Sequence, residues 1–152
     1  MRAEEKGMKR TKILVVEDNE DHRRILVLRL QHAGQFEVRE AVTGQEALDS
    51  IMREPPALVF LNLKLPVLDG WETARRIRAL PAPLNQLPII AVTAHAMVGD
   101  REKALAAGCD EYIAKPIVNP GEILDKLQRL LTRRGRPEPA SGASSQPRTS
   151  DL

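Results

Sequence analysis

Aromatic residues, cysteine and long apolar runs are all scarce in this chain of 152 residues. Aromatics make up 3% of the composition, so the core must be built from Leu, Ile, Val and Ala. The single cysteine, Cys109, cannot form an internal disulfide, which fits a reducing compartment. No apolar run approaches membrane-spanning length, and the polar N-terminus lacks the apolar segment of a signal peptide. We therefore expect a cytoplasmic protein with one well-cored domain.

The formal net charge of +2 comes from the two ends of the chain. Residues 1–12 hold five basic and two acidic residues, and residues 133–152 hold four basic and two acidic ones. Of the 23 basic and 21 acidic residues in the chain, 14 basic and 17 acidic ones lie in 13–132, which gives this part a net charge of −3. A mildly acidic body lacks the basic face of a nucleic-acid-binding protein. The arginines of 133–136 are interpreted as part of a solubilising tail, with weak nucleic-acid contact as the alternative.

Short apolar runs alternate along the chain with segments of helical periodicity. Strands are predicted at 13–16, 36–41, 57–62, 88–93 and 111–114. Helices are predicted at 20–33, from a capping box at 43–46 to about 54, at 71–80, at about 99–107 and from 119 to 131. This alternation indicates an α/β domain, a parallel sheet with helices on both faces, over residues 12–132. Residues 1–11 are predicted to form a flexible arm, and 133–152, rich in Pro, Ser, Gly and Ala, a disordered tail.

Polar side chains stand at the ends of four predicted strands, namely Glu17, Asp18, Asn62, Thr93 and Lys115. Ligands of such sheets bind beyond the carboxyl ends of the strands, so we expect these side chains to meet in one pocket. Paired carboxylates suit Mg²⁺, while a lysine and a hydroxyl suit phosphoryl oxygens. Phosphoryl transfer to a carboxylate also needs a nucleophilic oxygen, and Asn62 offers an amide, which is not a nucleophile.

Four segments have a recognisable composition, order and spacing: 13–20 (ILVVEDNE), 65–70 (LPVLDG), 89–95 (IIAVTAH) and 112–116 (YIAKP). With these motifs in register, residues 12–132 resemble a receiver domain of the two-component response-regulator family. The resemblance implies a flavodoxin-like (βα)5 fold, with a doubly wound parallel sheet of five strands.

The resemblance assigns metal-site roles to several residues. Glu17 and Asp18 match the acidic pair of the family, and Lys64 matches the position whose backbone carbonyl joins the metal shell. Position 62, four residues before Pro66, matches the phosphoacceptor, where the family has Asp and this chain has Asn62. We therefore expect no phosphorylation at position 62 and only weak binding of Mg²⁺.

The resemblance also implies a switch. Thr93 matches the hydroxyl residue and Tyr112 the aromatic residue that couple the pocket to the surface. Lys115 matches the lysine before a usually cis proline bond, and we expect it to point at residue 62. For Tyr112, the alternative is a half-buried aromatic residue of an edge strand. His22 and His95 are expected to be exposed polar residues.

The leading interpretation is a single-domain receiver that is not an enzyme and acts by protein–protein contact through residues 99–132. Its partner would be a histidine kinase, a phosphotransfer protein or another regulator, since no output domain is expected after the last helix. Asn62 has two open origins, a natural receiver that lost its acceptor or an Asp→Asn variant of a phosphorelay receiver.

Two rival functions remain open. One is a small α/β enzyme or binding protein that uses Asp18 and Thr93 on a phosphorylated ligand, although no glycine-rich phosphate loop is present. The other is a DNA-binding regulator, which the acidic body disfavours.

Overall fold

The computed structural model of the chain describes residues 10–94, 96–115 and 120–134. The predicted arm and tail fall largely outside these ranges, as do His95 and the proline that follows Lys115. None of the helices in the described ranges is long and apolar enough to cross a bilayer.

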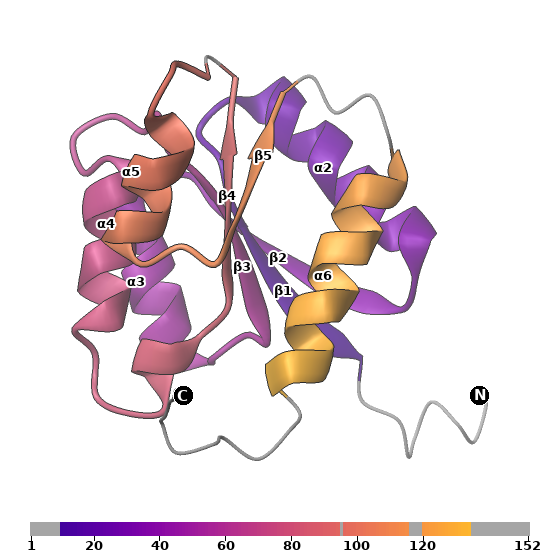
Figure 1. The fold of residues 1–152 in the computed structure, drawn as a ribbon. Helices are drawn as coiled ribbons and strands as arrows, with labels where there is room; N and C mark the ends of the chain where they lie inside the picture. Colours follow the sequence, from indigo (N-terminus) through magenta and orange to yellow (C-terminus); the bar gives the residue numbers. More distant parts are fainter. Residues whose placement is uncertain (1–9, 95, 116–119, 135–152) are drawn as a thin grey trace, which may run out of the picture.

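Five parallel strands form one sheet in the order β2-β1-β3-β4-β5 (Figure 1). The strands are β1 (Thr11–Val16), β2 (Phe36–Ala41), β3 (Leu58–Asn62), β4 (Ile89–Thr93) and β5 (Glu111–Ala114). The helices are α2 (Glu20–Ala33), α3 (Gly44–Arg53), α4 (Gly70–Arg78), α5 (Asp100–Ala107) and α6 (Pro120–Arg134), with a short 3-10 helix, η1 (Leu84–Gln86). The strand order is that of a flavodoxin-like doubly wound sheet, so the predicted fold class is confirmed.

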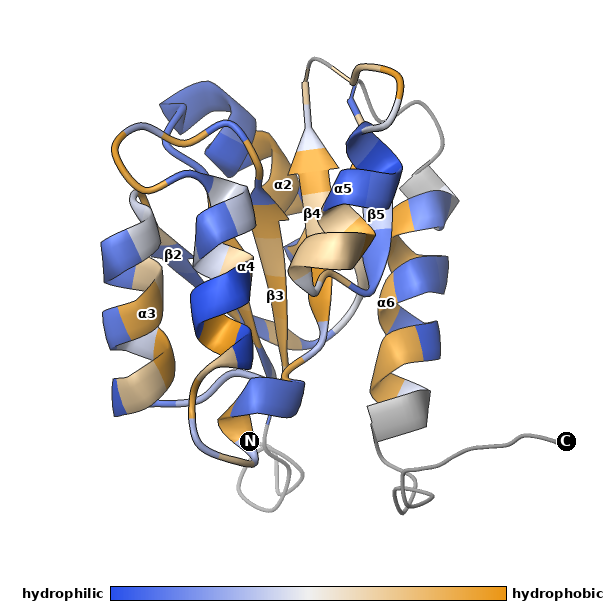
Figure 2. Cartoon of the chain, turned by 60° about the vertical axis from the view of Figure 1, so that its left-hand side comes forward, coloured by the Kyte–Doolittle hydropathy of each residue, from blue (hydrophilic) through white to orange (hydrophobic). Residues whose placement is uncertain are grey.

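Helices cover both faces of the sheet (Figure 1). Helices α3, α4 and α5 pack on one face and α2 and α6 on the other, each layer with its own buried apolar cluster. Successive β1 residues alternate between the clusters, Leu14 in the first and Val15 in the second. A strand covered on both sides has no solvent-facing positions, which explains the unbroken apolar runs in the sequence. Figure 2 shows the apolar stripes of α3, α4 and α6 turned toward the sheet and their polar stripes turned outward.

Helix α2 buries a narrower apolar stripe than its sequence suggests. Leu26 and Leu30 are buried, whereas the side chains of Ile25 and Leu28 are 52% and 49% exposed. Gly34 ends the helix as predicted, but its φ of −179° is ordinary extended backbone. Glycine is therefore not required there for its conformational freedom.

The ordered elements extend slightly past the predicted domain of 12–132. Thr11 is the first residue of β1, and α6 continues through Arg134. The predicted Thr43 cap of α3 is confirmed: Thr43 Oγ1 accepts a hydrogen bond from the Glu46 backbone N–H at 3.0 Å. The second bond of the capping box differs, because the Glu46 side chain bonds to the residue before the cap. The Glu46 carboxylate accepts in turn from the N–H of Val42 at 2.9 Å.

Arg78, at the end of α4, joins three segments of the first layer. Its guanidinium donates to the backbone carbonyls of Asn85 at 3.0 Å, Leu87 at 2.7 Å and Gly108 at 2.9 Å. It also pairs with the Asp110 carboxylate at 2.9 Å. The guanidinium is only partly exposed, and all three of its nitrogens donate hydrogen bonds. Arg78 therefore stabilises the segments that precede and follow β4.

Candidate functional site

The candidate site begins where β1 and β3 end side by side. The two strands pair in parallel with Val16 opposite Leu61, so the next residues, Glu17 and Asn62, emerge next to each other. Both side chains are buried, with 4% and 7% of their surface exposed. The expectation that strand ends bring Glu17, Asp18 and Asn62 together therefore agrees with the geometry.

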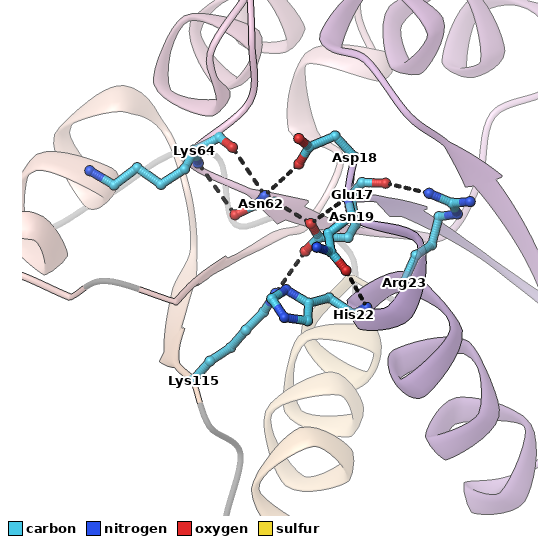
Figure 3. A network of polar contacts seen from close by, with 8 residues as sticks. All are labelled: Glu17, Asp18, Asn19, His22, Arg23, Asn62, Lys64 and Lys115. Carbon is cyan, nitrogen blue, oxygen red and sulfur yellow. Dashed lines mark hydrogen bonds and ion pairs between the residues drawn. The ribbon is translucent and has the colours of Figure 1, made fainter.

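The Asn62 amide is the centre of the polar network in Figure 3. Its Nδ2 donates to Glu17 Oε2 at 3.1 Å, Asp18 Oδ1 at 3.3 Å and the Lys64 carbonyl at 3.3 Å. Its Oδ1 accepts from the Lys64 backbone N–H at 3.3 Å. Acceptors surround the nitrogen and a donor faces the oxygen, so this orientation of the amide satisfies every group around it.

Lys115 reaches the site from the end of β5 but pairs with a different residue than expected. Its Nζ lies 2.7 Å from Glu17 Oε1 and 3.3 Å from His22 Nδ1. Among the described residues it makes no hydrogen bond to Asn62. A neutral amide attracts an ammonium group less than a buried carboxylate does, so the lysine pairs with Glu17.

Two residues around the start of α2, Asn19 and Arg23, hold Glu17 in place, and neither was assigned this role from the sequence. Asn19 caps the helix by accepting from the His22 N–H at 2.9 Å, and its own N–H donates to Glu17 Oε2 at 3.1 Å. Arg23 donates to the Glu17 carbonyl at 2.9 Å and pairs with Glu40 at 2.7 Å. An asparagine just before a helical pattern is an N-cap signal, so the Asn19 contact could have been predicted.

Gly70 lets α4 start directly against the end of β3. A Cβ on Gly70 would lie 2.4 Å from the Asn62 carbonyl oxygen and 2.5 Å from Leu63 Cα, closer than any side chain allows. Asp69 caps the helix, accepting from the Glu72 N–H at 2.8 Å. The Asp-Gly pair of the sequence motif is therefore explained by the structure: Asp69 is needed as a hydrogen-bonding cap, and Gly70 is needed because no side chain fits there.

The side chains of the two predicted switch residues, Thr93 and Tyr112, take no part in the hydrogen bonds of the site among the described residues. Thr93 is fully buried at the end of β4, and its carbonyl accepts from the Lys115 N–H at 2.7 Å. Neither the Thr93 hydroxyl nor the Tyr112 hydroxyl has a hydrogen-bond partner in the part of the chain that the structure describes. Burial raises the pKa of Tyr112, and the nearby carboxylates of Asp100 and Glu102 add to this. Tyr112 is a partly buried residue of an edge strand, and its switch role stays a prediction.

Trp71 connects the site to α5, a role that the sequence did not reveal. The indole, 8% exposed, lies under two lysine ammonium groups, that of Lys64 at 4.9 Å and that of Lys103 at 4.1 Å from its ring centroid. Such cation–π contacts attract each lysine to the ring. Lys64 therefore contacts the Asn62 amide through its backbone and Trp71 through its side chain.

A cavity of about 400 Å³ adjoins the site beside α2. Its walls combine apolar and basic side chains, from His22, Ile25, Leu26, Arg29, Val92, Ala94 and Lys115. His22 and Lys115 thus border both the cavity and the polar network.

The oxygens around Asn62 are of the kind that binds Mg²⁺, but the NH2 group of Asn62 occupies the point at which they meet. The Glu17, Asp18 and Lys64 oxygens all accept hydrogen bonds from an NH2 group. Within residues 10–94, 96–115 and 120–134, no group of three or more His, Cys, Asp or Glu side chains could hold a metal ion. A cation would need this amide to turn or move before it could enter.

Comparison with known proteins identifies the family. The response regulator receiver domain model matches residues 13–128. The chain belongs to the receiver domain family of response regulators. The transcriptional regulatory protein PrrA of Mycobacterium tuberculosis is 37% identical over 129 residues, 85% of this chain and 53% of that protein. The hybrid signal transduction histidine kinase G of Dictyostelium discoideum is 39% identical over 125 residues, 82% of this chain and 4% of the kinase. This receiver domain thus spans about half the length of the regulator.

Solved receiver domains have the same fold. The receiver domain of a sensor histidine kinase from Pseudomonas aeruginosa superposes with a TM-score of 0.74 and 36% identity, covering 82% of this chain and 99% of that one. That structure has a magnesium ion coordinated in its active-site cleft. The chemotaxis protein CheY4 of Vibrio cholerae has a TM-score of 0.71 and 28% identity, with 80% and 99% of the two chains covered.

Proposed function

We propose that this receiver domain acts in two-component signalling by protein–protein contact and is not phosphorylated at position 62. The observation that carries the proposal is the Asn62 amide at the centre of the polar network. An amide oxygen is a weak base, and the nitrogen lone pair is delocalised. Here the nitrogen is also engaged as a donor to three oxygens. No nucleophilic oxygen therefore stands where the family places its acceptor, and we propose that the chain is not an enzyme.

The proposed partner is a histidine kinase, a phosphotransfer protein or another regulator, contacted through residues 99–132. Two connections between the site and this region support the choice. Lys115, directly after β5, pairs with Glu17, and Lys103 of α5 contacts Trp71. The similarity to a part of a hybrid histidine kinase also favours a kinase-linked role. A partner bound to α5 would contact an element tied to the pocket through Lys103 and Trp71.

The proposal holds for either origin of Asn62. A natural receiver without its acceptor would signal through its folded surface alone. An Asp→Asn variant would be a phosphorelay receiver held in its unphosphorylated form. In both cases the chain as written lacks the covalent step.

Intact-mass measurement after incubation with Mg²⁺ and a small acyl-phosphate donor tests the proposal. The Asn62→Asp form is expected to gain one phosphoryl group, while the Asn62 chain gains none. An Asn62→Ala form, treated in parallel, reports any labelling elsewhere on the chain. Phosphorylation of the Asn62 chain above the Asn62→Ala background would refute the proposal.

A second candidate, binding of a small phosphorylated ligand, is favoured by the cavity beside α2. Three basic side chains, His22, Arg29 and Lys115, border it together with apolar ones. A ligand that binds the folded state stabilises it, and the melting temperature rises with the logarithm of the ligand concentration once this exceeds the dissociation constant. A thermal-shift screen with nucleotides and flavins therefore tests this candidate, which the absence of any concentration-dependent shift would eliminate.

A further inference from the structure

The oxygens that converge on Asn62 surround a hydrogen-bond donor. Glu17 Oε2, Asp18 Oδ1 and the Lys64 carbonyl lie 3.1, 3.3 and 3.3 Å from Nδ2. An NH2 group has two hydrogens, so the three acceptors share them. The nitrogen thus stands at the point where two carboxylates and a carbonyl meet, the position that a hard cation would take.

We infer that the Asn62 amide replaces a divalent cation in this pocket, so that the pocket is assembled without metal and resists metal binding. The inference rests on the proposed function, in which position 62 is the phosphoacceptor position of the family. It concerns cation binding, however, and not phosphorylation.

The charges around the amide support this replacement. The carboxylates of Glu17 and Asp18 both accept from Asn62, and one ammonium group, Lys115 Nζ, pairs with Glu17. An aspartate at position 62 would add a third carboxylate to this group, and like charges at such distances repel one another, which a bound cation would offset. The neutral amide removes the third charge and donates hydrogen bonds to the other two. The pocket therefore has less need of a metal ion than one with Asp at position 62.

The orientation of the amide adds a barrier beyond the missing charge. To ligate a cation between the carboxylates, Asn62 would have to turn its Oδ1 toward Glu17 and Asp18. The NH2 group would then face the Lys64 backbone N–H, which now donates to Oδ1 at 3.3 Å. Two donors would oppose each other, and the hydrogen bond would be lost. The amide therefore competes with a cation for the same oxygens.

Alanine at position 62 separates this inference from a simple loss of charge. If only charge and ligand number mattered, Asn62→Ala would bind Mg²⁺ no better than the Asn62 chain, because alanine supplies neither a charge nor an oxygen. If the amide blocks the cation, Asn62→Ala opens the space to Mg²⁺ and its waters. Magnesium keeps several waters when it binds to one or two carboxylates, so Glu17 and Asp18 would suffice.

The experiment is a Mg²⁺ titration of the Asn62, Asn62→Ala and Asn62→Asp forms, followed by fluorescence and by melting temperature. Trp71 is the only tryptophan, and its ring contacts the side chain of Lys64, so its emission reports on the site. We expect the dissociation constant to fall in the order Asn62, Asn62→Ala, Asn62→Asp, with about a tenfold difference between the first two. Without metal, the Asn62 chain should melt at a higher temperature than the Asn62→Asp form.

Equal or weaker Mg²⁺ binding by Asn62→Ala than by the Asn62 chain would overturn the inference. A metal-free Asn62→Asp form as stable as the Asn62 chain would do the same. Should Asn62→Ala not fold, as judged by circular dichroism, Asn62→Gly, which also supplies no side-chain oxygen, takes its place in the same ranking. If the Mg²⁺ titration contradicts the inference, the proposed function still stands or falls on the acyl-phosphate experiment. The titration measures cation affinity, whereas the acyl-phosphate experiment measures covalent labelling.

Discussion

Replacing Arg78 by methionine tests the view that one guanidinium holds the segments around β4 together. The change keeps an apolar stem of similar length and removes only the charged group. It deletes hydrogen bonds of 2.7 to 3.0 Å to the carbonyls of Asn85, Leu87 and Gly108, and the ion pair with Asp110. The effect is therefore specific to polar contacts between the end of α4 and its neighbours.

The magnitude follows from the number of contacts and from their partial exposure. A hydrogen bond to a charged group contributes about 1.5–3 kcal/mol. The Arg78 and Asp110 side chains are each 24% exposed, so water can replace part of what is lost. We expect Arg78→Met to lower the free energy of unfolding by about 3 kcal/mol, less than the sum of its four contacts.

Urea denaturation followed by Trp71 fluorescence and circular dichroism measures this change. Arg76→Met is the matched control, because Arg76 lies on the same helix, is 52% exposed and, within the described part of the chain, pairs only with Glu72, at 3.2 Å. An exposed pair of this kind contributes about 0.5 kcal/mol. If Arg78→Met destabilised the domain no more than Arg76→Met, the reasoning would be refuted.

Two further predictions concern Gly70 and Cys109. Gly70→Ala should lower the free energy of unfolding by at least about 2 kcal/mol, since its Cβ would overlap backbone atoms of Asn62 and Leu63; an unchanged urea midpoint would contradict the close packing. Burial raises the pKa of the Cys109 thiol to about 12 from a value of 9.0. The unfolded chain therefore loses this proton first, so the stabilisation is complete below pH 9.0 and lost as the pH rises toward 12. Compared with Cys109→Ala, the native domain should lose about 1 kcal/mol more between pH 8 and 10, and parallel stability curves would exclude this cause.

The sequence was sufficient to predict the architecture and the meeting of the strand ends. The run before Glu17 and the run before Asn62 are apolar without interruption, which is typical of strands buried on both faces. In a parallel sheet such strands end at one edge, so the approach of these two side chains follows from strand assignment alone.

The partners of individual charges could not be predicted in the same way. Lys115 was expected to point at Asn62, but it pairs with Glu17, and this choice depends on distances of a few ångströms that strand assignment does not give. The contacts of Arg78 join residues far apart in the chain and involve backbone carbonyls, which have no signal in the sequence. The contact of Trp71 with Lys103 likewise depends on how α4 and α5 pack.

The strand order has a consequence for how the domain meets other proteins. Strands β2 and β5 are the edges of the sheet, and β5 is only four residues long. Glu111 on β5 is held by Lys126 at 3.2 Å and Arg129 at 3.0 Å, and Glu40 on β2 by Arg23 at 2.7 Å. Charged, short edge strands disfavour the addition of a further strand. The domain is therefore protected against edge-to-edge aggregation, and another protein would bind its helices and loops instead of extending its sheet.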